Sequence, residues 1–172
     1  MNTADISIRP ATEQDQLAIT TLVHGEHLNP NDLNWRRFVV AIAPAGIVGA
    51  VQLRRHPDGS RELSSLVVRK EARHQGVAAR LIDARIAKET ARVFMITRVA
   101  FADYYARWGF RRIEPPEAPS AVWRNYWFGR LVGGLLSLLA GRRPSRLAIL
   151  DRSPALAPIR FANRAVSPTP LR

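Results

Sequence analysis

Apolar residues alternate or cluster along the chain in segments typical of strands and helices. Short runs rich in β-branched residues predict strands at residues 6–9, 38–42, 47–54, 63–68, 93–96, 110–113 and 147–150. Apolar residues at helical spacing predict helices at 12–25 and from residue 76 onward, each with one apolar face. The order begins with a strand and a helix, continues with three strands joined by turns, and leads through a loop to the principal helix. It predicts an α/β domain.

Turn and capping residues mark the ends of several of these segments. Thr12, followed by Asp15 and Gln16, is typical of a helix start with an N-cap and an acidic first turn. The run from His56 to Ser60, with the sequence His-Pro-Asp-Gly-Ser, predicts a tight hairpin between two strands. These signals support the strand order given above.

The segment from Glu62 to Ile82 joins a strand, a polar loop at 69–75 and a helix that opens at Gly76. The first turn of a helix has backbone N–H groups without an internal partner, and the helix dipole adds partial positive charge there. A glycine at this turn lets a phosphate approach the backbone, and Arg73 and Arg80 add full charges. The segment therefore predicts a phosphate site, although it is neither a P-loop nor a dinucleotide-binding turn.

The residues from Arg73 to Ala78, Arg-His-Gln-Gly-Val-Ala, resemble the Arg/Gln-x-x-Gly-x-Gly/Ala signature of the GNAT superfamily of N-acetyltransferases. The resemblance implies the α/β GNAT fold, with a central mixed, largely antiparallel sheet flanked by helices, and acetyl-CoA as co-substrate. Backbone N–H groups of residues 75–79 would hold the pyrophosphate, and the backbone of 66–68 would pair with the pantetheine arm. The implied cofactor-binding residues are Leu66, Val67, Val68, Arg73, His74, Gln75, Gly76, Val77, Ala78, Ala79 and Arg80.

A second motif, from Tyr104 to Phe110, resembles the GNAT pattern aromatic-Tyr-x-x-x-Gly-Phe. The resemblance implies that Tyr105 is the general acid that protonates the CoA thiolate as it leaves. From spacing alone, Phe101, Tyr104, Tyr105 and Trp108 form a helical stripe, which is more typical of core. With the resemblance, we predict a catalytic Tyr105 and place Phe101 and Trp108 in the core.

Glu62 is the candidate general base. It precedes Arg73 by eleven positions, an offset that resembles the catalytic glutamate of histone-acetyltransferase-like GNAT members. Such a carboxylate, directly or through water, would take a proton from the acceptor ammonium. The alternative is a solvated residue at the start of a strand, and the sequence leaves both interpretations open.

Acceptor contacts are expected from the segment before the second strand and from the strand before the hairpin. The candidates are Trp35, Arg36, Gln52 and Arg54, each with a plain alternative as a packed aromatic or an exposed polar residue. The run from Glu62 to Val68 with its loop is also similar to the acetyltransferase domain of N-acetylglutamate synthases. This similarity favours an amino-acid-like acceptor.

Composition limits the remaining function classes. The 172 residues suit one domain, which we place at 4–151, followed by a Pro/Arg-rich tail at 152–172 that we expect to be irregular. The net charge is +12, but residues 141–172 carry seven arginines and one acid, so we expect no nucleic acid partner. Without cysteine or a metal-type histidine spacing, no metal is expected. No apolar signal segment opens the sequence, which favours a cytoplasmic location.

Residues 122–140 form an apolar, Trp- and Leu-rich segment interrupted by Arg130. Its uninterrupted part is too short to span a bilayer. We expect a helix packed over the domain or at a homodimer contact, and the alternative is peripheral membrane contact through 122–143.

Together these features predict an N-acetyltransferase that moves an acetyl group from acetyl-CoA to a primary amine of a small molecule or peptide. The amine would attack directly in a ternary complex. Two other classes remain open: a non-catalytic acyl-CoA-binding regulatory module, and a basic protein associated with membrane surfaces or nucleic acid.

Overall fold

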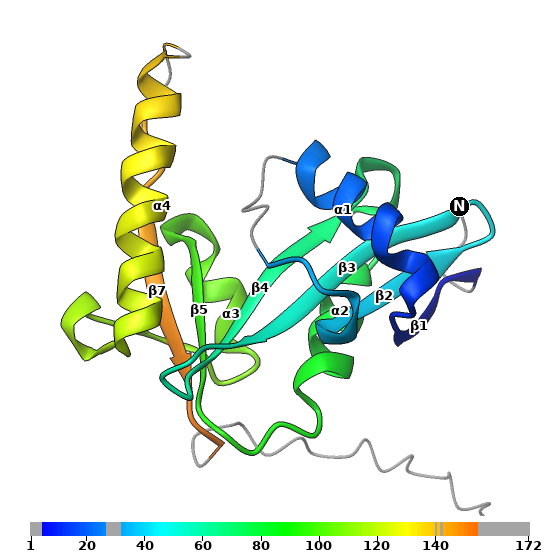
Figure 1. Cartoon of the computed structure of the whole chain (residues 1–172), viewed down its shortest axis with the longest axis horizontal. Coiled ribbons are helices and arrows are strands. Elements are labelled where there is room, and N and C mark those ends of the chain that lie inside the picture. The colour runs from blue at the N-terminus through cyan, green and yellow to red at the C-terminus, as the bar shows by residue number, and fades with distance from the viewer. Residues whose placement is uncertain (1–4, 27–31, 140, 142, 155–172) are drawn as a thin grey trace, which may run out of the picture.

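Seven strands form one sheet in the order β1-β2-β3-β4-β5-β7-β6. The computed structural model of the chain describes residues 5–26, 32–139, 141 and 143–154. Every neighbouring pair is antiparallel except β4 and β5, which run parallel. The strands are β1 (Ser7–Pro10), β2 (Phe38–Ala43), β3 (Gly46–Arg55), β4 (Arg61–Val68), β5 (Val93–Arg98), β6 (Arg111–Ile113) and β7 (Leu147–Arg152). The predicted mixed, largely antiparallel sheet is confirmed (Figure 1).

Helices cover both faces of this sheet. They are α1 (Gln16–Gly25), α2 (Val77–Ile86), α3 (Ala102–Ala106) and α4 (Ser120–Leu139). Side chains of β2 and β5 alternate between the faces. Ala41 and Met95 share a core with α2 and α3, whereas Val40 packs with α1 and Phe94 packs with α4. One face of the sheet therefore carries α2 and α3, and the opposite face carries α1 and α4.

The predicted helix at 12–25 consists of a short 3-10 turn, Glu13–Asp15, followed by α1. The N–H and hydroxyl groups of Thr12 both donate to Oδ2 of Asp15, at 2.7 and 2.9 Å, and Arg9 pairs with the same carboxylate at 2.7 Å. These bonds, with Arg9 first, lower the pKa of Asp15 from 3.8 to about 2. Thr12 thus caps this start as predicted, and β1 ends just before it, at Pro10.

The placement of Phe101 in the core is wrong. Its side chain is 51% exposed, whereas Trp108 is buried as predicted and donates from Nε1 to Oδ1 of Asp83 at 2.8 Å. The reason is local: a 3-10 turn, Val99–Phe101, precedes α3, so Phe101 does not continue the α-helical stripe. Gly109, at φ +80°, ends this region in the left-handed conformation that favours glycine.

The apolar segment at 122–140 forms α4, and the predicted final strand forms β7, which lies between β5 and β6. Asp58 in the β3–β4 hairpin fixes the start of α4, because its Oδ2 accepts from the Ala121 N–H at 2.9 Å and the Ser120 hydroxyl at 3.1 Å. Strand β7 continues to Arg152, the residue at which we placed the start of the tail. The rest of that tail, from residue 155, lies outside the described residues.

Within the described ranges, no helix is both long enough and apolar enough to cross a membrane. Helix α4 nevertheless leaves many apolar side chains exposed, including Trp123, Leu131 and Leu139.

Candidate functional site

The sheet opens where β4 and β5 separate. The two parallel strands pair only at Arg61 with Val93 and at Glu62 with Phe94 (Figure 1). Beyond this point β4 carries a bulge. Between the pairs Gln52–Ser64 and Ala50–Val67, one residue of β3 opposes two of β4, and Ser65 adopts φ +52°. A bulge bends its strand and ends regular pairing, so it accounts for the opening beside β5.

Two adjoining pockets of about 320 and 460 Å³ lie in this opening. They share Leu66 of β4, Arg98 of β5, and Phe101 and Tyr105 from the segment that follows. We refer to the two pockets together as the β4–β5 cleft. Five of the eleven predicted cofactor residues line it: Leu66, Val67, Val68, Arg73 and Ala78.

The turn before α2 has the geometry of an anion site. Gly76 adopts φ +72° and His74 adopts φ +62°, both left-handed. The first N–H of α2 that donates to the Gly76 carbonyl is that of Arg80, so the N–H groups of residues 77–79 precede the helical hydrogen-bond ladder. These amides and the helix dipole favour a negative group at the end of the cleft where Ala78 lies.

The two arginines predicted to assist this turn have different positions. Arg73 lines the cleft, donates from Nε to the Val68 carbonyl at 2.9 Å and pairs with Glu26 at 2.6 Å. Arg80 donates to the Ile6 carbonyl of the β1 region at 2.6 Å and does not line the cleft. His74, Gln75, Gly76, Val77 and Ala79 are also absent from the lining, so their contribution would come through the backbone.

Tyr105 lines both pockets of the cleft and is 8% exposed. Burial raises the pKa of its hydroxyl above the usual value of 10, and a hydrogen bond from Thr97 of β5 partly opposes this shift. Tyr104, Trp108 and Phe110 surround the ring at centroid distances of 5.3 to 6.3 Å. The ring is therefore held in place by aromatic contacts, and the hydroxyl is protonated at neutral pH.

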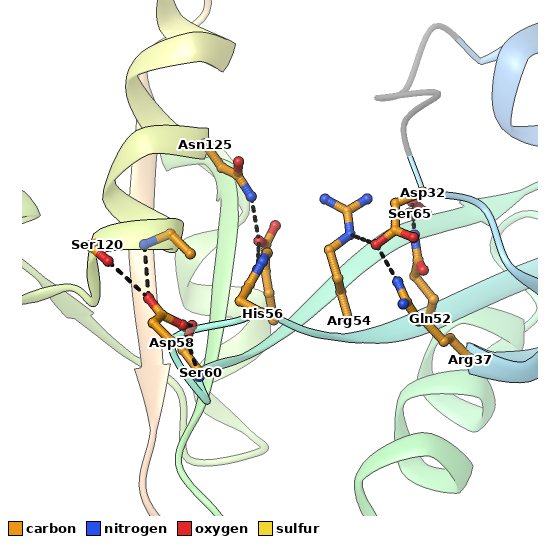
Figure 2. Close-up of polar contacts among 12 residues, drawn as sticks. Asp32, Arg37, Gln52, Arg54, His56, Asp58, Ser60, Ser65, Ser120 and Asn125 are labelled. Atoms are coloured by element: carbon orange, nitrogen blue, oxygen red, sulfur yellow. Dashed lines mark hydrogen bonds and ion pairs between the residues drawn. The ribbon is translucent and has the colours of Figure 1, made fainter.

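Polar side chains are buried on the face of the sheet that carries α1 and α4 (Figure 2). Glu62 is only 5% exposed. Its carboxyl group lies 2.8 Å from Nε2 of His56, within hydrogen-bond distance, and accepts from Nδ2 of Asn125 on α4 at 3.0 Å. The interpretation of Glu62 as a solvated residue is therefore wrong. Glu62 lies at the closed end of the opening and is not among the residues that line the cleft.

The predicted acceptor residues Gln52 and Arg54 lie on this same face, opposite Ser64 and Glu62. Gln52 is fully buried and donates from Nε2 to the Ser65 hydroxyl at 3.0 Å, which ties β3 to the bulge (Figure 2). Nε of Arg54 lies 3.6 Å from the carboxylate of Asp32, which also forms an ion pair with Arg37. Two guanidinium groups thus face one carboxylate.

Trp35 and Arg36 lie elsewhere. They line a separate pocket of about 460 Å³ with Gln16 of α1, and Arg36 stacks over the Trp35 ring at 4.4 Å. Gln16 accepts from the Trp35 N–H at 2.9 Å, which fixes this segment against α1. The structure does not bring these two residues to the β4–β5 cleft.

Several residues of the site were not predicted from the sequence: Ser65, Thr97, Arg98, His56 as a partner of Glu62, and Asn125. Only His56 carried a usable signal, because it opens the hairpin that leads into the strand of Glu62. Across the described parts of the chain, no group of three or more His, Asp or Glu residues could hold a metal ion.

Comparisons with known proteins agree with this geometry. Residues 34–112 match the family model of the acetyltransferase (GNAT) domain. No curated protein matches the sequence.

Among solved structures, N-acetylglutamate synthase from Neisseria gonorrhoeae, complexed with coenzyme A and L-arginine, has 20% identity and a TM-score of 0.63 over 86% of this chain. This chain covers only 33% of that protein. A Mycobacterium tuberculosis protein in complex with CoA has 20% identity and a TM-score of 0.62, with coverage of 86% of this chain and 98% of that one. A GNAT-family acetyltransferase from Staphylococcus aureus has 17% identity and a TM-score of 0.63, with 87% and 99% coverage.

At these identities the likeness to solved structures establishes the fold. The family match covers residues 34–112, just under half of the chain, and includes the bulge, the turn at Gly76 and Tyr105. This part of the chain therefore matches the acetyltransferase domain of the GNAT family.

Proposed function

We propose that the protein transfers the acetyl group of acetyl-CoA to a primary amine of a small molecule, preferably an amino acid or a similar carboxylate-bearing amine. The observation that carries the proposal is the β4–β5 cleft. It runs from the anion-binding turn at Gly76, past the bulged edge of β4, to the buried hydroxyl of Tyr105.

In this proposal the pyrophosphate of acetyl-CoA binds the N–H groups of residues 77–79, and Arg73 adds a positive charge. The pantetheine arm lies along Leu66, Val67 and Val68, where β4 has left β5 and its backbone can pair with an added strand. The thioester then reaches Tyr105, which lines both pockets of the cleft.

The neutral amine attacks the thioester carbonyl, which forms the carbon–nitrogen bond and places negative charge on the carbonyl oxygen. A backbone N–H of β4 near the bulge would stabilise that oxygen. When the carbon–sulfur bond breaks, the electron pair leaves on sulfur and the thiolate takes the proton of Tyr105. The amine loses one proton in the same sequence, so Tyr105 can be reprotonated through solvent.

Glu62 is the proposed destination of the amine proton, through ordered water. Its support is burial together with two fixed hydrogen bonds, from His56 and Asn125, which hold the carboxylate in one orientation. Because Glu62 does not line the cleft, direct contact with the amine is not part of the proposal.

The acceptor class rests on Arg54. The Asp32 carboxylate lies between Arg37 and Arg54, so this position on the α1 and α4 face suits a carboxylate (Figure 2). We propose that the acceptor carboxylate replaces Asp32 there. The N-acetylglutamate synthase of similar fold was solved with coenzyme A and N-acetyl-glutamate, which also supports an amino-acid acceptor.

A panel of amines tests the proposal, with CoA thiol and acetylated amine measured together. Amino acids are compared with the same amines lacking the carboxylate, and with polyamines, aminoglycosides and peptides. We expect equal amounts of thiol and N-acetyl product, highest for the amino acids. Binding of CoA without any acetylated amine across the panel would support the non-catalytic alternative.

A further inference from the structure

Helix α4 is apolar on two opposite sides. Its inner side packs on the sheet, where Val122 and Tyr126 are buried against Phe94, Ile113 and Ile149. Its outer side holds eight large apolar residues that are 37–76% exposed: Trp123, Trp127, Phe128, Leu131, Val132, Leu135, Leu138 and Leu139. We call these eight residues the outer face of α4.

The outer face is continuous. Positions 123, 127, 131, 135 and 138 follow one another at intervals of four or three residues, which aligns them on one side of an α-helix. Isolated exposed apolar residues are ordinary on proteins, but a continuous apolar patch marks a surface that another body covers. Figure 1 shows α4 at the margin of the molecule, with the sheet on one side of it.

The charges on α4 and on the segment that follows it, up to residue 146, are all positive. Residues 120–139 contain Arg124 and Arg130 and no acid. Arg130 lies over the Tyr126 and Trp127 rings at 5.7 and 5.0 Å, at the border of the outer face. Arg143 and Arg146 follow the helix and are exposed, and the whole chain carries a net charge of +12.

We propose that the outer face of α4 binds the surface of an anionic lipid bilayer, with the helix axis parallel to the surface. Trp and Leu side chains would enter the interface, and the arginines would reach the lipid phosphates. The helix does not cross the bilayer, because its inner side remains packed on β5 and β7.

A second copy of the chain is a less suitable partner for the outer face of α4 than a lipid bilayer. Arg124 lies among the outer apolar positions, between Trp123 and Trp127 in sequence, and α4 has no carboxylate to pair with it. Burial of an unpaired guanidinium in a protein interface is unfavourable. At a bilayer the same side chain can extend to the lipid phosphates while its stem stays in the apolar layer.

The test is co-sedimentation of the full chain with vesicles, either of phosphatidylcholine alone or of phosphatidylcholine with one third phosphatidylglycerol. We expect binding to the anionic vesicles, weakening with added salt, and at least about tenfold weaker binding to neutral ones. Binding should also shift tryptophan fluorescence to the blue, and the shift should be lost in the double variant Trp123→Phe, Trp127→Phe.

Leu131→Ser with Leu135→Ser should reduce vesicle affinity about tenfold or more, because two partly inserted leucines are lost. The matched control is Leu17→Ser, which removes a leucine that is 78% exposed on α1, compared with 73% for Leu131. Both variants should bind CoA like the wild type, which verifies that they fold. The proposal is overturned if anionic vesicles do not bind the protein or bind the α4 variant equally well. It is also overturned if the wild type instead forms a dimer that this variant abolishes.

Discussion

At the residue scale, Tyr105 has the position that the proposed proton donor requires. It lines the cleft and is held by surrounding aromatic rings. Burial raises its pKa above the usual value of 10, which keeps the hydroxyl protonated but makes it a weaker acid. The sequence motif predicts a catalytic role for Tyr105, whereas spacing alone does not separate it from its neighbours. Trp108 of the same stripe is core and Phe101 is exposed, and only the three-dimensional structure distinguishes the three positions.

Replacing Tyr105 with Phe should lower kcat by about 10²-fold or more while CoA affinity changes less than about twofold, because only the proton donor is removed. Steady-state kinetics with calorimetry check this. Since the pKa is raised, the hydroxyl stays protonated below about pH 10. Ionisation of Tyr105 should therefore not lower the wild-type kcat at any pH in the neutral range. Unchanged kcat in the variant would make Tyr105 a core residue.

Arg54 is the residue on which the acceptor class depends. Arg54→Gln should raise KM for an amino-acid acceptor about 10- to 100-fold, because a charged hydrogen bond to the carboxylate is lost. The KM for acetyl-CoA should stay the same. The amine that lacks the carboxylate serves as the control. Its KM should be the same with the wild type and with Arg54→Gln. If both acceptors lose the same factor, Arg54 is structural.

At the element scale, the strand-loop-helix at β4–α2 could be predicted well because its chemistry is local. A left-handed glycine at the helix start and a β-branched strand before it both follow from residue type. The bulge at Ser65 could not be predicted, since a serine at φ +52° leaves no sequence signal and is imposed by pairing with β3. Arg80 was expected at the phosphate, but it bonds to Ile6, 74 residues away in sequence.

Gly76→Ala should weaken acetyl-CoA binding and cost about 1–2 kcal/mol of stability, because φ +72° is strained for any residue with a Cβ. Space is not the limit, since an added Cβ would meet nothing within 4 Å. Gly134→Ala is the matched control. An added Cβ there also meets nothing within 4 Å, and helical φ should make it stabilise by about 0.5–1 kcal/mol. Thermal denaturation and calorimetric titration with CoA are measured on both variants. Equal stability and equal CoA affinity in the two variants would contradict the proposed role of the left-handed turn at Gly76.

The start of α1 gives a pH-dependent prediction. Asp15 has its pKa lowered from 3.8 to about 2 by Arg9 and Thr12. Its contribution to stability is therefore fully present above about pH 4 and is lost as the pH falls through about 2. Asp15→Asn should cost about 1–2 kcal/mol at neutral pH and progressively less in acid. Denaturant titrations of both proteins at several pH values measure this, and a difference that does not depend on pH would rule out the carboxylate as the cause.

At the scale of the whole molecule, the order of strands and helices along the chain followed from apolar runs and helical periodicity, because most elements bury apolar side chains. Helix α4 is different, since both of its sides are apolar and its sequence could not tell which side packs on the sheet. Glu62 shows the same limit for polar residues. Its burial depends on Asn125, which is 63 residues away in sequence.

The central claim is that the β4–β5 cleft holds acetyl-CoA. The most direct test is a calorimetric titration with CoA of a variant whose new side chain fills the cleft. Leu66 lines both pockets, so Leu66→Trp should abolish CoA binding or weaken it about 100-fold or more while the fold is retained. Leu17→Trp on the exposed side of α1 is the control and should bind like the wild type. Wild-type affinity in Leu66→Trp would contradict the claim.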